Sequence, residues 1–448
     1  MPLYQINKKL LPIKIHFFLV MAGTAPILPF LSTISKQRGY SPVIVGLIFT
    51  ILPLPGLLVR PVIGAITDKY KCRKTAFVLN TVLRSLLINI LIFIPGSVVR
   101  AELNDTDVIK SPIFWLFVCT VTLYKVDSMT GTVLEDTICI DILGENKTEY
   151  GNQRMWGSIG WGIMSIVSGV CVDWYSKGLD HKNYTPGFII SLICSILDIY
   201  VVSSMPYVQN REVKAGSNDI KRVLTNIRVQ SFLLFVLAFG TLLPFIWYYL
   251  FWYMEDISNI YHPETKPYIK TIQGFSLTIQ CLGGEVPFFF LSNFILKRIG
   301  HTNVFSLMFF AYAVRFYLYS IITNPVWVLP VELLNGITYA LAYAAAISYA
   351  AELAPVGAEG TLQGIVGTTM EEIGAPIGSS IGGYLFNHFG SITSYTFVSG
   401  FALAVCITQI IVQRLINRFS KNDSIKGERS GSSYFTVDPH ISVNDNLI

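Results

Sequence analysis

The chain contains about twelve long apolar stretches that are separated by short polar links. A bilayer core about 30 Å thick requires about 20 helical residues to cross it. The stretches that meet this requirement cover residues 10–34, 42–66, 75–94, 111–132, 156–172, 188–204, 232–253, 272–295, 304–322, 326–350, 362–386 and 395–416. They are apolar on all sides, whereas the strands of a membrane barrel alternate apolar and polar residues. Since a backbone in lipid must satisfy its own hydrogen bonds, the sequence predicts an all-α polytopic membrane protein with twelve transmembrane helices.

The composition supports the same environment. Hydrophobic residues make up 52% of the chain and charged residues only 14%, whereas a soluble domain has about 25% charged residues. The net charge of +5 does not indicate a nucleic-acid partner, because the basic residues lie in short loops between the stretches, where they set orientation. The lipid bilayer is therefore the expected partner of the surface.

The distribution of Lys and Arg predicts the orientation. With the N-terminus placed in the cytoplasm, about 21 basic residues fall on the cytoplasmic side and about 8 on the other, so both termini are expected to be cytoplasmic. Asn104 opens an Asn-Asp-Thr sequence on the opposite side and is a candidate glycosylation acceptor. The first stretch is too long for a cleaved signal and should act as its own anchor. The plasma membrane and the endosomal system both stay open as locations.

A polar, basic link divides the stretches into six and six. The sequence therefore predicts an N-terminal bundle over 1–205, a cytoplasmic loop over 206–230 and a C-terminal bundle over 231–418. The remaining segment, 419–448, is rich in Ser, Asn and Asp and is expected to be a disordered cytoplasmic tail. Two groups of six helices around a central loop are typical of secondary transporters, which hold their substrate near the membrane midplane between the groups.

Several motifs carry a family resemblance. The loop after the second stretch reads Gly64-Ala-Ile-Thr-Asp68-Lys69, and the fifth stretch opens with Tyr150-Gly-Asn-Gln-Arg-Met-Trp-Gly-Ser-Ile-Gly-Trp-Gly162. The chain resembles the major facilitator superfamily over residues 10–416, in particular the branch of major facilitator superfamily domain-containing protein 6. The resemblance implies two six-helix bundles, a cavity lined by helices one, four, seven and ten, and an overall similarity to sugar–proton and nucleoside–proton symporters. Glu371 and Glu372 depart from the pattern, because relatives carry a Gly-Leu-Gly-Arg-like run there.

Charged residues inside a membrane span are costly, so they mark a pathway, a relay or a structural lock. The candidates for a substrate or ion pathway are Lys125, Asp127, Glu285, Arg315 and Glu332. The candidates for a gate or for the interface between the bundles are Arg60, Asp68, Arg84, Glu135, Asp136, Arg154, Glu371 and Glu372.

Depth along the helices predicts which of these charges meet. Arg315 and Glu332 lie on consecutive antiparallel spans at similar depth, so we expect an ion pair, which acts either as a coupling pair or as a lock between two helices. Asp127 and Arg84 can pair for the same reason. Lys125 and Asp127 are two residues apart and face opposite sides of one helix, so each is either a cargo contact or a structural group.

The other charged residues and the aromatic residues of 245–253 have the following interpretations. Glu135, Asp136 and Arg154 form either a structural clasp or an inner gate. Arg60 is expected to pair with Glu371 or Glu372 in one state of the transport cycle. Glu285 is either a lone carboxylate that carries a proton or a neutral, hydrogen-bonded acid. His16 is expected to be interfacial, and the aromatic residues of 245–253 form either a lipid-boundary belt or a platform that stacks on cargo.

The sequence contains neither a phosphate-binding Gly loop followed by Lys nor a His-Glu-x-x-His motif, and its seven cysteines follow no metal-binding spacing. An enzyme, a cofactor and a metal centre are therefore not expected. The sequence predicts a secondary active transporter of a small polar solute that works by alternating access, with a proton as the candidate coupling ion. The alternative is a transporter-like receptor or adaptor without flux.

Overall fold

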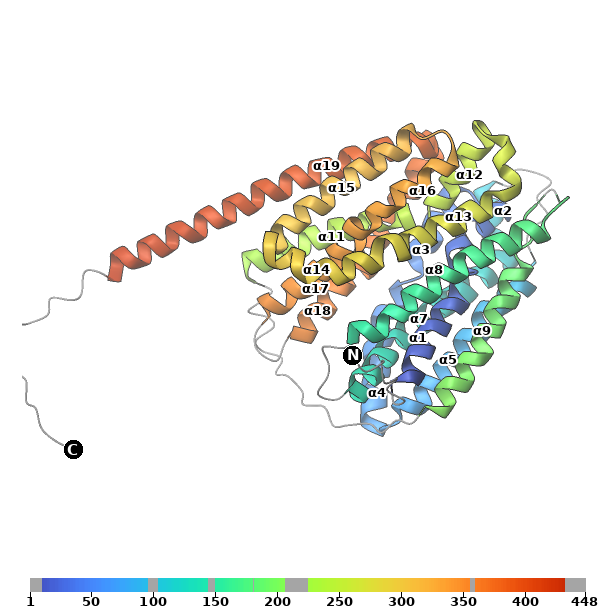
Figure 1. Cartoon of the computed structure of the whole chain (residues 1–448), viewed down its shortest axis with the longest axis horizontal. Helices are drawn as coiled ribbons and strands as arrows, with labels where there is room; N and C mark the ends of the chain where they lie inside the picture. Colours follow the sequence, from blue (N-terminus) through green and yellow to red (C-terminus); the bar gives the residue numbers. More distant parts are fainter. Residues whose placement is uncertain are drawn as a thin grey trace, which may run out of the picture.

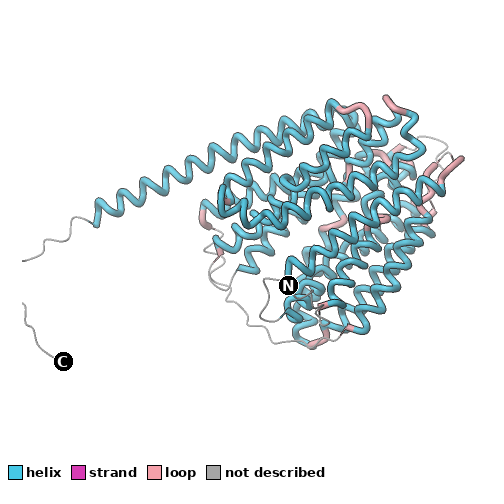
Figure 2. The backbone as a smooth tube through the Cα atoms, in the orientation of Figure 1, coloured by secondary structure: helices cyan, strands magenta, loops and turns pink. Residues whose placement is uncertain are grey.

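The computed structural model describes residues 10–95, 104–143, 150–179, 181–205, 225–354 and 359–431. Every regular element among these residues is a helix (Figure 2). The first half comprises α1 (Leu11–Thr24), α2 (Leu31–Gln37), α3 (Pro42–Ile51), α4 (Leu54–Tyr70), α5 (Arg73–Ile90), α6 (Asp105–Lys110), α7 (Pro112–Leu143), α8 (Tyr150–Tyr175) and α9 (Thr185–Ser204).

The second half begins at α11 (Ile227–Trp247) and α12 (Leu250–Ile260). It continues through α13 (Ile269–Thr278), η5 (Ile279–Glu285), α14 (Val286–Ile299), α15 (His301–Ile321), α16 (Val328–Val331), η8 (Gly336–Leu341), α17 (Ala342–Leu353), α18 (Glu359–Gly367), η9 (Thr368–Gly374) and α19 (Ala375–Gly431). In Figure 1 the helices of each half lie together as one group.

The described helices account for twelve membrane crossings. Eleven helical segments are long and apolar enough to span a bilayer. The last, Thr361–Ile416, has 56 residues and would be about 84 Å long at about 1.5 Å per residue, far more than one crossing needs. Gly390, with φ 75° and ψ 166°, breaks it, so this segment crosses twice. The predicted number and positions of the spans are therefore confirmed.

The outer surface suits lipid. Large apolar side chains such as Leu58, Phe93 and Phe290 are 75%, 81% and 64% exposed, which would be unfavourable for so many residues in water. The ionisable side chains of Arg84, Asp127 and other mid-span residues are instead buried between helices. The charges therefore lie inside the protein, as a membrane protein requires.

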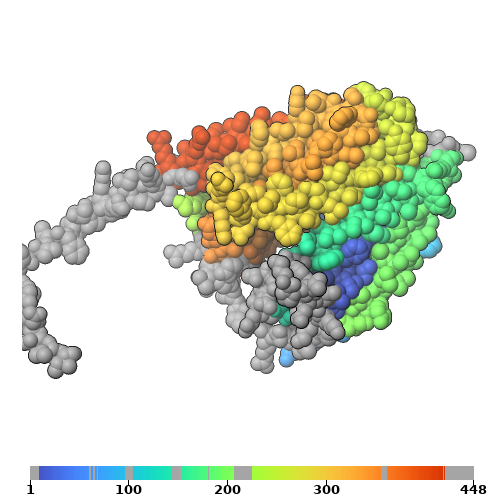
Figure 3. Space-filling view, in the orientation of Figure 1, coloured from blue at the N-terminus to red at the C-terminus, as the bar shows by residue number. Residues whose placement is uncertain are grey.

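Two helix pairs make the most extensive contacts between the halves. α8 packs against α13, and α3 packs against the first part of α19. A Cβ atom added at Gly274 of α13 would lie 2.6 Å from the carbonyl oxygen of Ser165, so only glycine allows this approach. The space-filling view shows α8, in green, directly against the yellow helices of the second half (Figure 3).

The ends of the bundle differ. We call the end that carries α2, α12 and residues 261–268 the distal end, and the end at which α1 and α5 begin the terminal end. In Figure 1 the two groups of helices approach each other near α2 and α12 and diverge toward α4 and α18. α19 continues to Gly431 and so enters the segment 419–448 for which the sequence predicts disorder. Extending an existing helix gains one hydrogen bond per added residue. Residues 432–448 lie outside the described part of the chain.

Three segments of the second half are π-helices, namely η5, η8 and η9. The wider turn of a π-helix is rare and is found frequently at functional sites. These segments carry Gln280, Glu285, Thr338, Glu371 and Glu372. Several polar residues of the second half therefore lie where the helices depart from regular geometry.

Candidate functional site

A fully buried ion pair lies at the centre of the second half. A guanidinium nitrogen of Arg315 on α15 lies 2.5 Å from Oε2 of Glu332, and neither side chain is exposed. The hydroxyl of Tyr319 donates to Oε1 of Glu332, and Nε2 of Gln280 donates to Oε2 at 2.5 Å. The predicted pairing of Arg315 and Glu332 is therefore confirmed, and Glu332 also binds two neutral donors.

A hydrogen-bonded network connects this pair to the first half. Arg315 donates to Oδ1 of Asn335 at 2.9 Å, and Nδ2 of Asn335 donates to Oε1 of Glu285 at 3.1 Å. Ser158 on α8 donates to the other oxygen of Glu285 at 3.4 Å. Glu285 is thus hydrogen-bonded at the interface between the halves and not isolated, and its role as a proton carrier stays a prediction.

Aromatic side chains lie beside this interface. Tyr339 packs edge-on against Trp247, with ring centroids 6.0 Å apart, and interacts electrostatically with Glu285, Glu371 and Arg154. These residues come from five helical segments of both halves. The structure therefore brings Glu285, Glu371 and Arg154, three of the predicted site residues, to one region lined by aromatic side chains.

Tyr248 extends this region across the interface. Its ring stacks on that of Phe49 from α3, with centroids 3.9 Å apart and ring planes at 6°. Tyr248 and Trp247 are both half-buried, so they do not form a simple belt at the lipid boundary. Sequence reasoning left both roles open for this helix, and the packing places these two rings toward the interior.

The charges of the first half form a second buried group. Asp127 on α7 lies 3.8 Å from Nε of Arg84 on α5 and accepts a 2.7 Å hydrogen bond from Asn80. The predicted pairing of Arg84 and Asp127 is confirmed, although Nε of Arg84 makes no hydrogen bond among the described residues. Lys125 is half-buried on the same helix.

His16 is buried rather than interfacial, so that expectation is wrong. Its Nδ1 lies 2.8 Å from Oδ1 of Asp198 on α9, and its Nε2 lies 2.9 Å from Oε2 of Glu135 on α7. All three side chains are at most 3% exposed. The sequence offered one signal for this cluster, since each residue lies within about three turns of the terminal end of its helix.

The role of Glu135, Asp136 and Arg154 as a clasp or as an inner gate stays a prediction. Glu135 binds His16, while Arg154 lies 5.3 Å from the ring centroid of Phe17 and acts on Glu135 through space. Asp136 is half-buried on the same helix. Another ion pair near this end joins Arg73 to Asp141 at 3.2 Å, because α5 and α7 run side by side there.

A cluster of charges joins the two halves at the distal end; we call it the distal clamp and define it as Lys36, Asp256, Glu255 and Lys270. Lys36 of α2 lies 2.6 Å from Asp256 and 3.7 Å from Glu255 on α12. Lys270 of α13 pairs with Glu255 and donates to Thr33 of α2 at 3.1 Å. Sequence reasoning used these residues only for orientation and missed their pairing.

Asp173 at the end of α8 adds a second contact between the halves at this end. Its Oδ2 accepts hydrogen bonds from the backbone nitrogen and the hydroxyl of Thr271, at 2.6 Å and 2.8 Å. Its Oδ1 lies 2.6 Å from Nζ of Lys182. The distal clamp and Asp173 therefore close the distal end in this conformation.

The structure gives less information on the remaining predicted residues. The side chains of Arg60 and Asp68 are outside the described ones, but their helix α4 contacts η9, which carries half-buried Glu371 and buried Glu372. Asn104 is exposed. Among the described residues no group of three His, Cys, Asp or Glu side chains is arranged to hold a metal ion.

Comparison with known proteins identifies the family. The model of the MFS_1 like family matches residues 10–397. The chain belongs to this family. It is 22% identical over 400 residues to a maltose permease of Geobacillus stearothermophilus, a match that covers 86% of the chain and 90% of the permease. It is 27% identical to major facilitator superfamily domain-containing protein 6-like protein A of Xenopus laevis over 275 residues, which are 58% of the chain and 41% of that protein's length.

The fold agrees with this assignment. The solved structure of the nucleoside transporter NupG superimposes with a TM-score of 0.72 at 15% identity, covering 90% of the chain and 98% of that structure. The resemblance to the major facilitator superfamily and to its domain-containing protein 6 branch is confirmed. This MFS_1-like protein is a multi-pass membrane transporter of the secondary type, with a small molecule as its substrate.

Proposed function

We propose that this MFS_1-like transporter binds a small polar solute between its halves, at the region formed by Glu285, Glu371, Arg154, Tyr339 and Trp247. The observation that carries the proposal is the hydrogen-bonded network from Glu332 to Ser158, because it connects a buried ion pair to the surface between the halves. Burying charged side chains inside a membrane protein is energetically costly, and such residues usually mark a substrate or ion pathway.

The lining favours a solute with hydroxyl groups and an apolar face. Carboxylates and Arg154 can hydrogen-bond hydroxyls, while the rings of Trp247, Tyr248 and Tyr339 can pack against a sugar or a base. Related proteins include a maltose permease and a nucleoside transporter. We therefore infer a sugar-like or nucleoside-like solute, with Lys125 and Asp127 as candidate contacts from the first half.

The transport cycle would alternate which end is open. The proposed moving bodies are 1–205 and 231–418, joined by the loop 206–230, and the distal clamp would break when the distal end opens. On the positive-inside pattern the terminal end is cytoplasmic, and so are both termini. Asp68 and the pair of Arg60 with Glu371 or Glu372 are the proposed contacts that close the terminal end.

A proton is the proposed coupling ion, and the protein is proposed to have no enzymatic activity and no nucleic-acid partner. Glu285 and Glu332 are proposed to exchange the proton, because the hydroxyl of Ser158 can accept from protonated Glu285 and that of Tyr319 from protonated Glu332. Glu332 would take up the proton when its pair with Arg315 opens. Coupling would require that protonation and solute binding favour the same conformation.

The test is solute flux into liposomes that contain the purified protein, measured over a panel of sugars and nucleosides at two pH values. The expected result is saturable uptake of one class. Tyr339→Ala should raise KM by about tenfold or more, since a buried aromatic contact is worth about 1–3 kcal/mol. Tyr317→Ala is the matched control, because Tyr317 is 55% exposed on the outer surface.

Two results would contradict the proposal. If no solute of the panel is carried while the protein binds one of them, the protein is a receptor or adaptor without flux. If Tyr339→Ala and Tyr317→Ala carry the solute equally well, the solute site lies elsewhere.

A further inference from the structure

The cluster of His16, Glu135 and Asp198 requires one more proton than its side chains ordinarily carry. Both ring nitrogens of His16 lie within hydrogen-bond distance of a carboxylate oxygen, at 2.8 Å and 2.9 Å. A neutral imidazole has one N–H and one lone pair, and an ionised carboxylate only accepts. Both bonds can therefore form only if the ring is an imidazolium or one carboxyl is protonated.

The surroundings make this proton costly to lose. The three side chains are at most 3% exposed, and α1, α7 and α9, which carry them, come from the first half only. Without the extra proton the cluster would hold two negative charges in a region of low dielectric constant. One carboxylate would also face a ring nitrogen that has no hydrogen to give, which removes a contact between two helices.

Groups on every neighbouring element face the cluster. On α5, Arg84 acts on Glu135, and Phe77 packs edge-on against the His16 ring at 4.8 Å. On α8, Arg154 acts on Glu135. On α7, Cys139 lies close enough to interact with Glu135 and Asp136. The two guanidinium groups lower the cost of the negative charge that remains when the proton leaves, but they do not replace the missing hydrogen bond.

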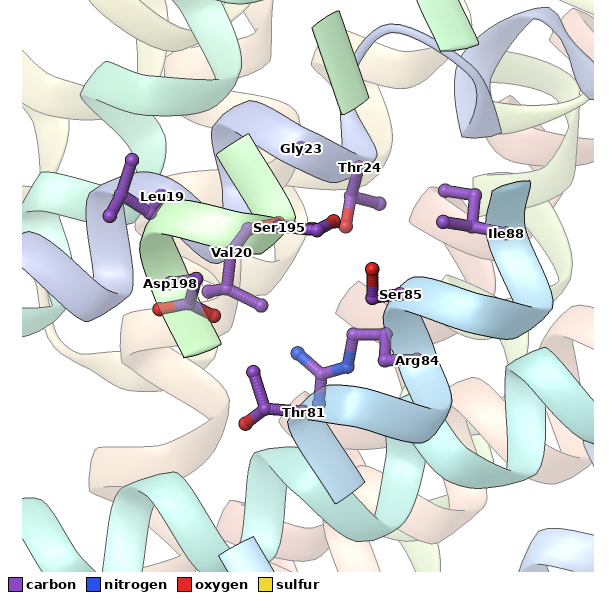
Figure 4. Close-up of a pocket in the computed structure, with 10 residues that line it drawn as sticks. All are labelled: Leu19, Val20, Gly23, Thr24, Thr81, Arg84, Ser85, Ile88, Ser195 and Asp198. Carbon is purple, nitrogen blue, oxygen red and sulfur yellow. Dashed lines mark hydrogen bonds between the residues drawn. The ribbon is translucent and has the colours of Figure 1, made fainter. Parts of the chain in front are cut away.

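A small pocket lined by polar and apolar residues lies beside the cluster. Residues of α1, α5 and α9 line it, and they include Asp198, Arg84, Thr24, Ser85 and Ser195. Figure 4 shows Asp198 on one side of the pocket and Arg84 on the other. Since Arg84 also pairs with Asp127, the pocket links the cluster to the other buried charge group of the first half.

We infer that His16, Glu135 and Asp198 form a proton-binding site in the first half of the transporter, separate from the Arg315–Glu332 network of the second half. The bound proton holds α1 against α7 and α9, and its release loosens these contacts as the transporter changes conformation. This inference deepens the proposed function and rests on it for the role of the proton in transport, while the existence of the site can be tested without flux.

The variant Asp198→Asn removes the need for the extra proton but keeps the hydrogen bonds between the helices. Its amide can donate to Nδ1 of a neutral His16 ring, while Nε2–H donates to Glu135, so both hydrogen bonds persist without the extra proton. In liposomes, solute counterflow should be retained, whereas accumulation driven by a proton gradient should fall to the level of protein-free liposomes. Glu135→Gln should behave alike by the same reasoning.

The matched control is His262→Gln, because His262 is a partly exposed histidine that pairs with Glu264 in the 261–268 loop. It should leave both activities unchanged. If the wild type and Asp198→Asn respond identically to the proton gradient, the inference is wrong while the proposed function stands. If neither carries a solute, the proposed function fails, and the spectroscopic test below decides the site.

The spectroscopic test reads the proton directly in the purified protein. The chain has six histidines, so ¹⁵N-histidine NMR of the wild type and of His16→Gln identifies the signal of His16. We expect either an imidazolium signal of His16 at neutral pH, or a protonated carboxyl band in the infrared spectrum that Asp198→Asn removes. A neutral His16 ring with neither signature would overturn the inference.

Discussion

At the scale of single residues, buried charges in the described spans have specific neutral partners in addition to their counter-ions. Glu332 binds Arg315, Tyr319 and Gln280. Asp127 binds Asn80 in addition to Arg84. A buried pair of this kind contributes little net stability when intact but is costly to break, because one partner is then left as an uncompensated charge.

Glu332→Gln is therefore expected to destabilise the protein by about 3–5 kcal/mol, since it leaves Arg315 buried without a counter-ion. The measurement is thermal unfolding of the detergent-solubilised protein. The double variant Arg315→Met with Glu332→Gln should recover most of this loss, because no unpaired charge remains. If flux also survives in the double variant, the pair is a structural lock and not a coupling pair.

At the scale of elements, close helix contacts depend on glycines. Gly46 of α3 and Gly383 of α19 face each other across the two halves near the distal end. A Cβ atom added at Gly383 would lie 2.7 Å from the carbonyl oxygen of Pro42, and one at Gly46 would lie 2.8 Å from that of Ser379. Thr50 strengthens the same contact through a 2.7 Å hydrogen bond to Ser380.

Gly383→Ala is expected to separate α3 from α19 and to favour a conformation with an open distal end, at a cost of about 1–3 kcal/mol to the closed one. The measurement is the distance between spin labels at Lys177 and Tyr261, both exposed at this end, in a variant without other cysteines. Gly400→Ala is the control in the same helix, because its Cβ would meet nothing within 4 Å. Equal distance distributions for both variants would contradict the expectation.

At the scale of the whole molecule, the structure is closed at one end by contacts between its halves. The distal clamp is partly exposed, with Lys36 and Asp256 side chains at 25% and 24%. The ion pairs of the clamp that join the halves are those of Lys36, whose partners are 18% and 24% exposed. Water can still screen these partly exposed pairs, so the clamp biases an equilibrium rather than locking it. Such a weak closure is what reversible opening requires.

Asp256→Lys is expected to open the distal end, because it places a third cation near Lys36 and Lys270. The same spin-label distances should lengthen, and adding Lys36→Asp should shorten them again. His262→Gln, in the nearby loop but within one half, should have no effect. Failure of the charge swap to restore the shorter distance would mean that these residues do not clamp the halves.

The predicted orientation can be tested at the same scale. Asn104 is exposed and lies in the link between α5 and α7, at the distal end. If both termini are cytoplasmic, expression in cells with N-glycosylation should add a glycan that a glycosidase removes and that Asn104→Gln abolishes. A second sequence of this type, Asn146-Lys-Thr148, lies in the link between α7 and α8, outside the described residues. The positive-inside pattern predicts that this link is cytoplasmic, so Asn146 should stay unmodified. Modification of Asn146 alone would reverse the orientation.

The amino-acid sequence by itself determined the membrane environment, the twelve crossings and the pairings between neighbouring spans, such as Arg315 with Glu332 and Arg84 with Asp127. These follow from apolar length and from depth, which residue number along a helix measures directly. Only the tertiary structure decided the His16 cluster, the network from Glu332 to Ser158 and the distal clamp. Each of these joins helices far apart in the chain, and their meeting depends on helix rotation and on π-helical turns, which depth along a helix does not encode.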